Sequence, residues 1–297
     1  MAVVGGTEDA VGETVIGLLH PGEMGAAVGG CLTARGAEVG WVPDGRSPAT
    51  AGRAAAAGLT AVLAVSELAA RAGFILSICP PHAALDVARA VAGAPGGFAG
   101  IFVDANAISP GTAGQVREVV EQAGASYVDG GIIGRPPGGP AGSTRLYLSG
   151  PRAGQVRDLF TGTGLDARVI DTGPGSVAAS AVKIAYAGWT KGTAALILAV
   201  RALARADGVE ETLLEEWALS QPELAGRSAA AARSAAAKGW RWTGEMTEIA
   251  ASMAAAGLPD GFHQAAADIF RRTGPGTADG TDSTDSTVQV LRQILAD

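Results

Sequence analysis

The sequence predicts a doubly wound α/β domain followed by an all-α domain, and three observations carry this prediction. Short, nearly continuous apolar runs alternate with helical patterns through the first half of the chain. A glycine-containing turn separates the first apolar run from the first helical pattern, and no strand pattern recurs beyond residue 172. Apolar strands that alternate with helices form a parallel sheet covered on both faces. The expected architecture is therefore a Rossmann-type, doubly wound parallel sheet with a helical C-terminal domain.

The first half of the chain divides into apolar runs that end at glycine, proline or polar residues. We expect strands over 14–19, 38–42, 59–65, 73–78, 100–104 and 126–129. Helical patterns lie between them, over 24–35, 47–57, 66–70, 83–91 and 110–123. A loop rich in glycine and proline follows at 135–142, and two further short strands are expected over 145–148 and 167–170. This alternation is typical of βαβ units.

The second half of the chain begins with a long, mostly apolar helical pattern over 176–206, which we expect to link the two domains. Further helices are expected over 209–219, 222–238, 243–256 and 260–272. An apolar helix must be buried by its own domain or by a second subunit, so we predict a homodimer through the α-domain. The predicted organisation is a flexible N-terminal tail (1–13), a dinucleotide-binding domain (14–172), an all-α substrate and dimerisation domain (173–272), and a flexible tail with a short terminal helix (273–297).

Composition excludes several classes of protein. The chain has 297 residues, of which 47% are hydrophobic, so it can bury a large core. Its net charge is −7 and it has no basic run, which argues against nucleic-acid and anionic-membrane partners. Two cysteines cannot form a disulfide framework, and three distant histidines do not have metal-ligand spacing. The N-terminus does not resemble a signal peptide. We therefore expect a cytoplasmic protein without a metal.

The turn after the first strand is a candidate dinucleotide loop. The Rossmann pattern requires G-x-G-x-x-G between a strand and a helix, so that the backbone and the helix N-terminus approach the pyrophosphate. Here His20 stands at the first glycine position, and Gly22 and Gly25 hold the second and third. An ordinary Gly/Pro turn is the alternative. We predict cofactor contacts from the loop residues His20, Pro21, Gly22, Glu23 and Met24.

The end of the second strand bears on the choice between NAD and NADP. Asp44 could bind a ribose diol, as an acidic residue does in NAD-dependent proteins. Arg46 and Ser47 follow it, and a guanidinium beside a hydroxyl suits a 2′-phosphate. Alternatively, Ser47 is a helix N-cap and Arg46 a solvated loop residue. We favour NADP(H) as the cofactor.

Several turns resemble those of the β-hydroxyacid dehydrogenase and 6-phosphogluconate dehydrogenase superfamily. The resemblance covers residues 14–272 and rests on the glycine loop, the Cys79-Pro80-Pro81 turn, the segment 104–106, the segment 129–134 and Lys183. It implies an oxidoreductase with a catalytic lysine early in the long interdomain helix, at Lys183. It also implies cofactor contacts from Cys79, Pro80, Pro81 and Asn106, and substrate contacts from Gly131 and Ile132.

The C-terminal half is similar to a bacterial subgroup that carries a phosphogluconate-dehydrogenase-like domain of poorly defined function. Segments 183–192, 240–246 and 257–263 carry this likeness. The chain also departs from the superfamily, because Ile133 and Ala187 stand where a serine and an asparagine help hold a substrate carboxylate. Thr190 replaces the acidic residue that phosphogluconate enzymes use after decarboxylation. Sugar-phosphate decarboxylation is therefore not expected.

Lys183 is the candidate general acid/base. On a helix, Lys183 and Thr190 lie about 20° apart, so their stripe is expected to face the cleft between the domains. A partly desolvated lysine there could exchange a proton with an alcohol or an alkoxide. Tyr186 is a second candidate for this role, and a snorkelling surface lysine is the alternative interpretation of Lys183. Lys191 is expected to be solvated or at an interface.

A dense aromatic and charged cluster could line a substrate pocket. Large aromatic side chains beside a paired arginine and glutamate suit such a wall, but they suit helix packing or a dimer contact equally well. The predicted substrate-lining residues of this cluster are Trp189, Trp240, Arg241, Glu245 and Met246.

The leading interpretation is an NADP-dependent oxidoreductase that transfers a hydride between NADPH and a small carbonyl or hydroxy compound, with Lys183 as general acid/base. An imine reductase is the first alternative. The missing carboxylate-binding residues favour it, whereas Lys183 counts against it, because imine reductases that resemble this fold usually carry Asp or Tyr there. A non-catalytic NADPH-binding protein is the second alternative, since His20 departs from the glycine pattern.

Overall fold

The computed structural model describes residues 15–140, 142–273 and 283–296. The chain forms two compact units, residues 1–183 and 184–297. The first unit therefore extends beyond residue 172, the predicted end of the dinucleotide-binding domain. The reason is that the first turn of the long helix packs on the sheet, where a Cβ on Gly131 would lie 2.6 Å from the carbonyl oxygen of Ala179. The predicted N-terminal tail lies outside the described residues.

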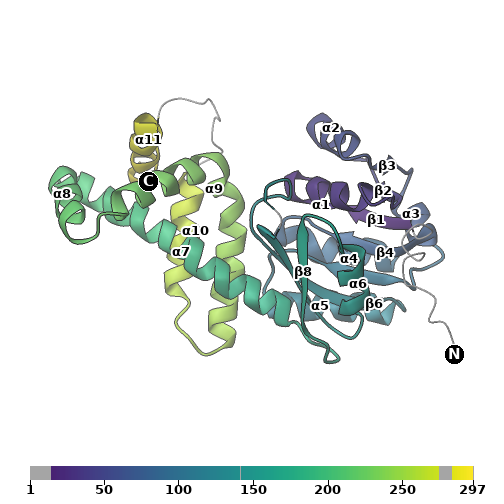
Figure 1. Ribbon diagram of the computed structural model, residues 1–297. Helices are drawn as coiled ribbons and strands as arrows, with labels where there is room; N and C mark the ends of the chain where they lie inside the picture. The colour runs from purple at the N-terminus through teal and green to yellow at the C-terminus, as the bar shows by residue number, and fades with distance from the viewer. Residues whose placement is uncertain (1–14, 141, 274–282, 297) are drawn as a thin grey trace, which may run out of the picture. The chain divides into compact units, whose positions relative to one another are not determined.

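The first unit contains one eight-stranded sheet in the order β3-β2-β1-β4-β5-β6-β7-β8 (Figure 1). All neighbouring strands are parallel except β6 and β7, which are antiparallel. This confirms the doubly wound fold, whose strand order reverses between β1 and β4. The strands are β1 (Val15–Leu19), β2 (Val39–Trp41), β3 (Thr60–Ala61), β4 (Ala72–Ser77), β5 (Ile101–Asp104), β6 (Ser126–Ile133), β7 (Thr144–Ser149) and β8 (Leu165–Asp171).

Helices cover both faces of this sheet. The helices are α1 (Glu23–Thr33), α2 (Pro48–Ala56), α3 (Val65–Arg71), α4 (Ala84–Ala92), α5 (Pro110–Gln122) and α6 (Ala153–Leu159), with a short 3₁₀ turn over Pro81–Ala83. One buried cluster joins α1, α2 and α6 to the sheet, and a second joins α3, α4 and α5 to it. The nearly continuous apolar strands follow from this two-sided burial.

Two local features of the first unit differ from expectation. The segment 129–134 is expected to be a turn, but β6 continues through it to Ile133. The antiparallel strand β7 pairs with it from Asp129 to Ile133, which keeps this stretch extended. Helix α6 has no counterpart among the expected elements. Its seven residues lie between β7 and β8.

The second unit is helical. Helix α7 (Ala178–Ala206) enters it from the first unit, and α8 (Glu210–Ser220), α9 (Leu224–Ala255), α10 (Gly261–Arg272) and α11 (Ser283–Leu295) follow. Met246, Phe270 and Leu291 lie in its buried core. The last of these belongs to α11, so this part of the predicted tail is an ordered helix. Across the described residues, no helix is both long and apolar enough to span a membrane.

Helix α9 is one element of 32 residues, where two helices over 222–238 and 243–256 were expected. The helix continues through Gly239, the first residue after the helix expected over 222–238. A Cβ at Gly239 would lie 2.5 Å from the hydroxyl of Thr273, so the glycine is needed for close packing against the end of α10. Tertiary packing thus overrides a weak local preference.

Candidate functional site

The loop after β1 has the backbone of a dinucleotide loop although its first glycine is replaced. His20 has a φ of 69°, and it is the sole non-glycine residue in the left-handed region in the described part of the chain. Histidine adopts this region more readily than most side chains, at a modest cost. A Cβ at Gly25 would lie 2.5 Å from the His20 carbonyl oxygen, so Gly25 is required for the close turn.

The N-terminus of α1 is open toward the loop. Gly22 is the N-cap of this helix, and no side chain caps it by a hydrogen bond. A Cβ at Gly22 would meet nothing within 4 Å, so the space beside it can admit another group. Of the neighbouring residues, Pro21 is buried, Met24 half-buried and Glu23 exposed. Glycines beside an uncapped helix N-terminus fit the pyrophosphate of a dinucleotide.

Burial keeps His20 and Cys79 neutral at this edge of the sheet. Burial and the nearby charge of Arg46 lower the pKa of His20 to about 4, and its Nδ1 atom has no hydrogen-bond partner. Burial raises the pKa of the Cys79 thiol to about 12, and Arg46 opposes this shift. Arg46 therefore lies close enough to both residues to act on them electrostatically. His20 is a neutral imidazole at pH 7 and Cys79 is an unreactive thiol.

The turn between β2 and α2 presents polar groups to solvent. Asp44, Arg46 and Ser47 are all exposed. The Ser47 hydroxyl caps α2 by accepting a hydrogen bond from the Thr50 amide at 3.3 Å, as the alternative interpretation of this residue predicted. Arg53 donates to the Thr50 hydroxyl at 3.0 Å. The turn thus combines an exposed guanidinium with a helix N-terminus, a combination that binds phosphate well.

Asn106 ties together the carboxyl ends of β4 and β5. Its Oδ1 atom accepts a hydrogen bond from the Cys79 amide at 2.5 Å, and its Nδ2 atom donates to the Ser77 hydroxyl at 3.0 Å. The side chain is only 2% exposed. Asn106 therefore shapes the Cys79-Pro80-Pro81 turn from behind, and of these three residues Pro80 is the exposed one.

Lys183 lies at the same edge of the sheet. Its amine donates a hydrogen bond to the Ile132 carbonyl oxygen at 2.8 Å. Gly131 lies directly beneath it, since a Cβ there would be 3.0 Å from the Cβ of Lys183. The Ile132 side chain is buried in the core below α1, and its carbonyl is the group that faces the lysine. Three residues predicted from the resemblance are thus brought together.

The remaining predicted site residues belong to the second unit. Tyr186 and Trp189 are exposed on α7. Trp240 is also exposed and stacks with Arg241, whose guanidinium carbon lies 5.0 Å from the ring centroid. Met246 is fully buried in the helical core, because its position on α9 faces α7 and α10. Met246 is therefore a packing residue.

The surroundings of Lys191 differ from expectation. It is expected to be solvated or at an interface, but its side chain is only 18% exposed and forms an ion pair with Glu245. Its amine also lies 5.5 Å from the centroid of the Trp242 ring, which in turn packs edge-on against Phe270. The sequence does hint at this pair, because Glu245 is an acidic residue within an aromatic segment of α9 and would need a cationic partner if buried.

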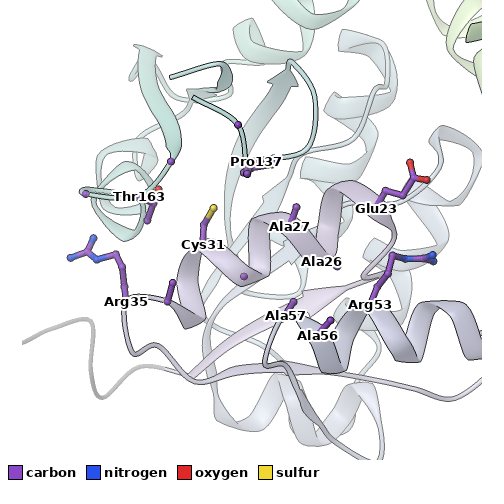
Figure 2. A pocket seen from close by; sticks show the side chains of 16 residues that line it. Glu23, Ala26, Ala27, Cys31, Arg35, Arg53, Ala56, Ala57, Pro137 and Thr163 are labelled. Carbon is purple, nitrogen blue, oxygen red and sulfur yellow. The ribbon is translucent and has the colours of Figure 1, made fainter. Parts of the chain in front are cut away.

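Figure 2 shows a separate groove of about 670 Å³ that follows α1. Small residues of the helix form its floor, and Arg35 lies toward one end of it. The opposite side comes from two loops whose turns need glycine, since Gly138 and Gly162 have φ values of 133° and 76°. Residues that line the groove include Glu23, Ala26, Ala27, Cys31, Arg53, Pro137 and Thr163.

A family comparison matches residues 14–164 to the NAD binding domain of 6-phosphogluconate dehydrogenase. This match covers just over half of the chain. The chain belongs to the 6-phosphogluconate dehydrogenase-like family of oxidoreductases. Residues 204–273 of this dehydrogenase match a domain of unknown function, DUF1932. A comparison with curated proteins finds no match.

Solved structures share the fold of this dehydrogenase over nearly its whole length. One is a conserved protein of unknown function, described as similar to 3-hydroxyacid dehydrogenases, with 27% identity and a TM-score of 0.64 over 93% of this chain and 99% of that chain. Another is 3-hydroxyisobutyrate dehydrogenase from Mycobacterium tuberculosis with L-serine, with 19% identity and a TM-score of 0.68 over 93% and 99%. A reductive aminase from Aspergillus terreus, in complex with NADPH4, cyclohexanone and allyl amine, has 17% identity and a TM-score of 0.54 over 92% and 98%.

Proposed function

We propose that this dehydrogenase transfers a hydride between NADPH and a small carbonyl or hydroxy compound, with Lys183 as the general acid/base. One observation carries the proposal. The Lys183 amine is held 2.8 Å from the Ile132 carbonyl oxygen, at the edge of the sheet where the dinucleotide loop begins. Ligands of doubly wound sheets bind at this carboxyl edge, next to the point where the strand order reverses.

Gly22 and the first turn of α1 would hold the pyrophosphate, and the β2–α2 turn would hold the adenosine ribose. Arg46 favours a 2′-phosphate, because the guanidinium is exposed and its field reaches His20 and Cys79. Ser47 would add a hydroxyl and the N-terminus of α2. A charge-assisted hydrogen bond contributes roughly 1.5–3 kcal/mol, or about ten- to a hundredfold in affinity.

Bound NADPH supplies the hydride that reduces the substrate carbon. In this direction, the Lys183 ammonium gives a proton to the developing alkoxide oxygen, and in oxidation the neutral amine takes it back. The hydrogen bond to the Ile132 carbonyl oxygen orients the Lys183 amine. Tyr186 remains a second candidate, and Trp189, Trp240, Arg241 and Glu245 are proposed to border the substrate.

An imine reductase is the second candidate function. The observation that favours it is Ile133, a buried apolar residue at the place where relatives carry a carboxylate-binding serine. Ala187 is likewise apolar and buried. A panel of ketones and 3-hydroxy acids, run beside a panel of cyclic imines with NADPH, separates the two functions. Turnover of imines alone would replace the carbonyl assignment.

Self-association through α7 is also proposed. Six exposed apolar side chains recur along this helix at alternating spacings of three and four or at a whole heptad, which is the pattern of a two-helix seam. They are Val182, Tyr186, Trp189, Leu196, Val200 and Leu203. A second copy of the chain would cover this stripe over about 30 Å. A sedimenting mass of one chain would refute the homodimer, and Leu196→Glu is expected to dissociate it.

The cofactor assignment is tested by titrating the protein with NADPH and NADH and following tryptophan fluorescence. We expect NADPH to bind at least about tenfold more tightly, and Arg46→Ala to weaken NADPH binding by roughly ten- to a hundredfold while NADH binding changes little. Arg35→Ala is the matched control, because Arg35 holds the carbonyls of Asp158 and Leu159 at the other end of α1. Equal affinities for the two nucleotides would overturn the NADP assignment.

Both cysteines are free thiols, which supports a reducing compartment such as the cytoplasm.

A further inference from the structure

Four buried polar residues form a row across β4, β5, β6 and β7, at the last residues of β4, β5 and β7 and in the middle of β6. In the sheet register, Ser77 lies opposite Asp104 and Asp104 lies opposite Asp129. Asp129 in turn lies opposite Ser149. Each of them is at most 1% exposed. Register partners project to the same face of a sheet. The row therefore lies on the face that carries α5 and the start of α7, where a polar side chain needs a partner.

The start of α7 is that partner. The Asp129 carboxylate accepts hydrogen bonds from the Ser180 amide at 2.9 Å, the Ser180 hydroxyl at 2.5 Å and the Ser149 hydroxyl at 2.9 Å. The Ser149 hydroxyl accepts in turn from the Ala179 amide at 3.1 Å. Two first-turn amides of α7 are thus capped by strand residues distant in sequence. A carboxylate at this end also complements the helix dipole.

The same turn carries Lys183. This residue follows Ala179 by four positions and Ser180 by three, so all three lie on one face of the helix. Two residues of β6 form hydrogen bonds with this face of the helix. Asp129 accepts from the Ser180 amide, and the Ile132 carbonyl oxygen accepts from the Lys183 amine. Gly131 lies between these two contacts and permits the approach, because a Cβ there would be 2.6 Å from the Ala179 carbonyl oxygen.

We infer that Asp129 is the positioning residue for Lys183: by capping α7 it sets the rotation and height at which the lysine amine meets Ile132. The inference rests on the proposed function of Lys183, but the geometry that it describes does not depend on turnover. Asp129→Asn keeps the shape of the side chain and replaces one acceptor oxygen with a donor group. The remaining oxygen can still accept from the Ser180 amide and the Ser149 hydroxyl, but the negative charge is lost and the Ser180 hydroxyl loses its acceptor. We expect the weaker cap to loosen the first turn of α7.

The test uses the lysine amines directly. The sequence has only three lysines, Lys183, Lys191 and Lys238. Reductive methylation with ¹³C-formaldehyde therefore labels few sites, and loss of one signal in Lys183→Arg assigns Lys183. In Asp129→Asn we expect the Lys183 signal and its titration midpoint to move toward those of Lys238, which is exposed. The signals of Lys191 and Lys238 should stay where they are.

Asp171→Asn is the matched control. Asp171 also lies near the start of α7, where it is exposed and accepts from the Gly173 amide at 2.9 Å and the Ser176 hydroxyl at 2.6 Å. We expect no movement of the Lys183 signal in this variant. An equal movement would show that any change before the helix disturbs the lysine, and an unchanged signal in folded Asp129→Asn would overturn the inference directly.

Ser180→Ala keeps the test decisive if Asp129→Asn does not fold. It removes one of the three donors to Asp129 and is expected to move the Lys183 signal in the same direction by less. An unmoved signal in both Ser180→Ala and Ser149→Ala would equally overturn the inference. With any substrate that the panels identify, Asp129→Asn should lower kcat by about tenfold or more while NADPH affinity is kept. If Lys183→Ala retains full turnover, the proposed function fails, whereas the labelled amines still report on the position of Lys183.

Discussion

Two lysines of one helix have opposite surroundings. At the start of α7, the amine of Lys183 donates to a backbone carbonyl. Two turns later, Lys191 pairs with the Glu245 carboxylate and lies beside the Trp242 ring. A carboxylate and an aromatic face both stabilise the charged form of a lysine amine, so these contacts hold the Lys191 ammonium in the helical core. We therefore expect Lys183 to take part in proton transfer, as proposed above, and Lys191 to contribute to helix packing.

The largest expected effect is on turnover at the first lysine. Lys183→Ala should lower kcat by on the order of a hundredfold or more, with the NADPH dissociation constant unchanged, because only the proton-transfer group is removed. Lys191→Ala, measured on the same substrate, should leave kcat within a few-fold. Steady-state kinetics with NADPH titrations distinguishes these outcomes. The reverse pattern would exchange the roles of the two lysines.

The second lysine should matter for stability instead. Lys191→Ala leaves Glu245, whose side chain is 14% exposed, without its cation. Breaking a largely buried pair from one side costs about 3 kcal/mol of unfolding free energy. The double variant Lys191→Met/Glu245→Leu should recover most of this loss, because no uncompensated charge remains. Urea unfolding checks the values, and a double variant no more stable than Lys191→Ala would show that the pair itself is not responsible.

A glycine lies near each of the two lysines, and we expect the two glycines to differ in how well they tolerate a larger side chain. Gly131→Ala should destabilise the protein by about 2 kcal/mol, because its Cβ would press on the Ala179 backbone. Gly188→Ala on α7 should change stability by less than about 1 kcal/mol. Its Cβ would meet only the side chains of His263 and Ile249 at 3.4 Å, and alanine favours the helix. Thermal unfolding of both variants tests this, and equal losses would contradict the tighter packing at the helix start.

The polar row should also make the stability of the protein depend on pH. Burial raises the pKa of Asp104 from 3.8 to about 7, with the Asn106 amide opposing the shift. Between these values the unfolded carboxyl loses its proton while the folded one keeps it. Stability therefore falls as pH rises through this window, by up to about 1.4 kcal/mol per pH unit.

Asp104→Asn should flatten this fall, which urea unfolding between pH 4.5 and 7.5 measures. Asp129 contributes a slope of the same sign, since burial raises its pKa as well. Asp171→Asn is the control, because hydrogen bonds from Ser176 and Gly173 lower the pKa of that exposed carboxyl. A wild-type stability that rises over the same window would contradict ionisation of a buried acid.

The sequence by itself determined the doubly wound sheet, the helical second half and the dinucleotide loop. Alternating apolar runs and glycine positions are local patterns, and secondary structure follows them closely. The helix that begins after Ser47 and its N-cap were also predicted from a local sequence pattern. His20 shows the limit of pattern matching, because its left-handed backbone keeps the loop geometry that a glycine would allow.

Only the tertiary structure decided which polar groups meet. It joined α9 across Gly239, turned the segment 129–133 into a strand, and paired Lys191 with Glu245, 54 residues away. It also set Asp129 beneath Ser180, 51 residues further along the chain. No local pattern records such contacts, because they depend on the register of strands and the packing of helices, and each buried polar group must then find whatever partner that packing supplies.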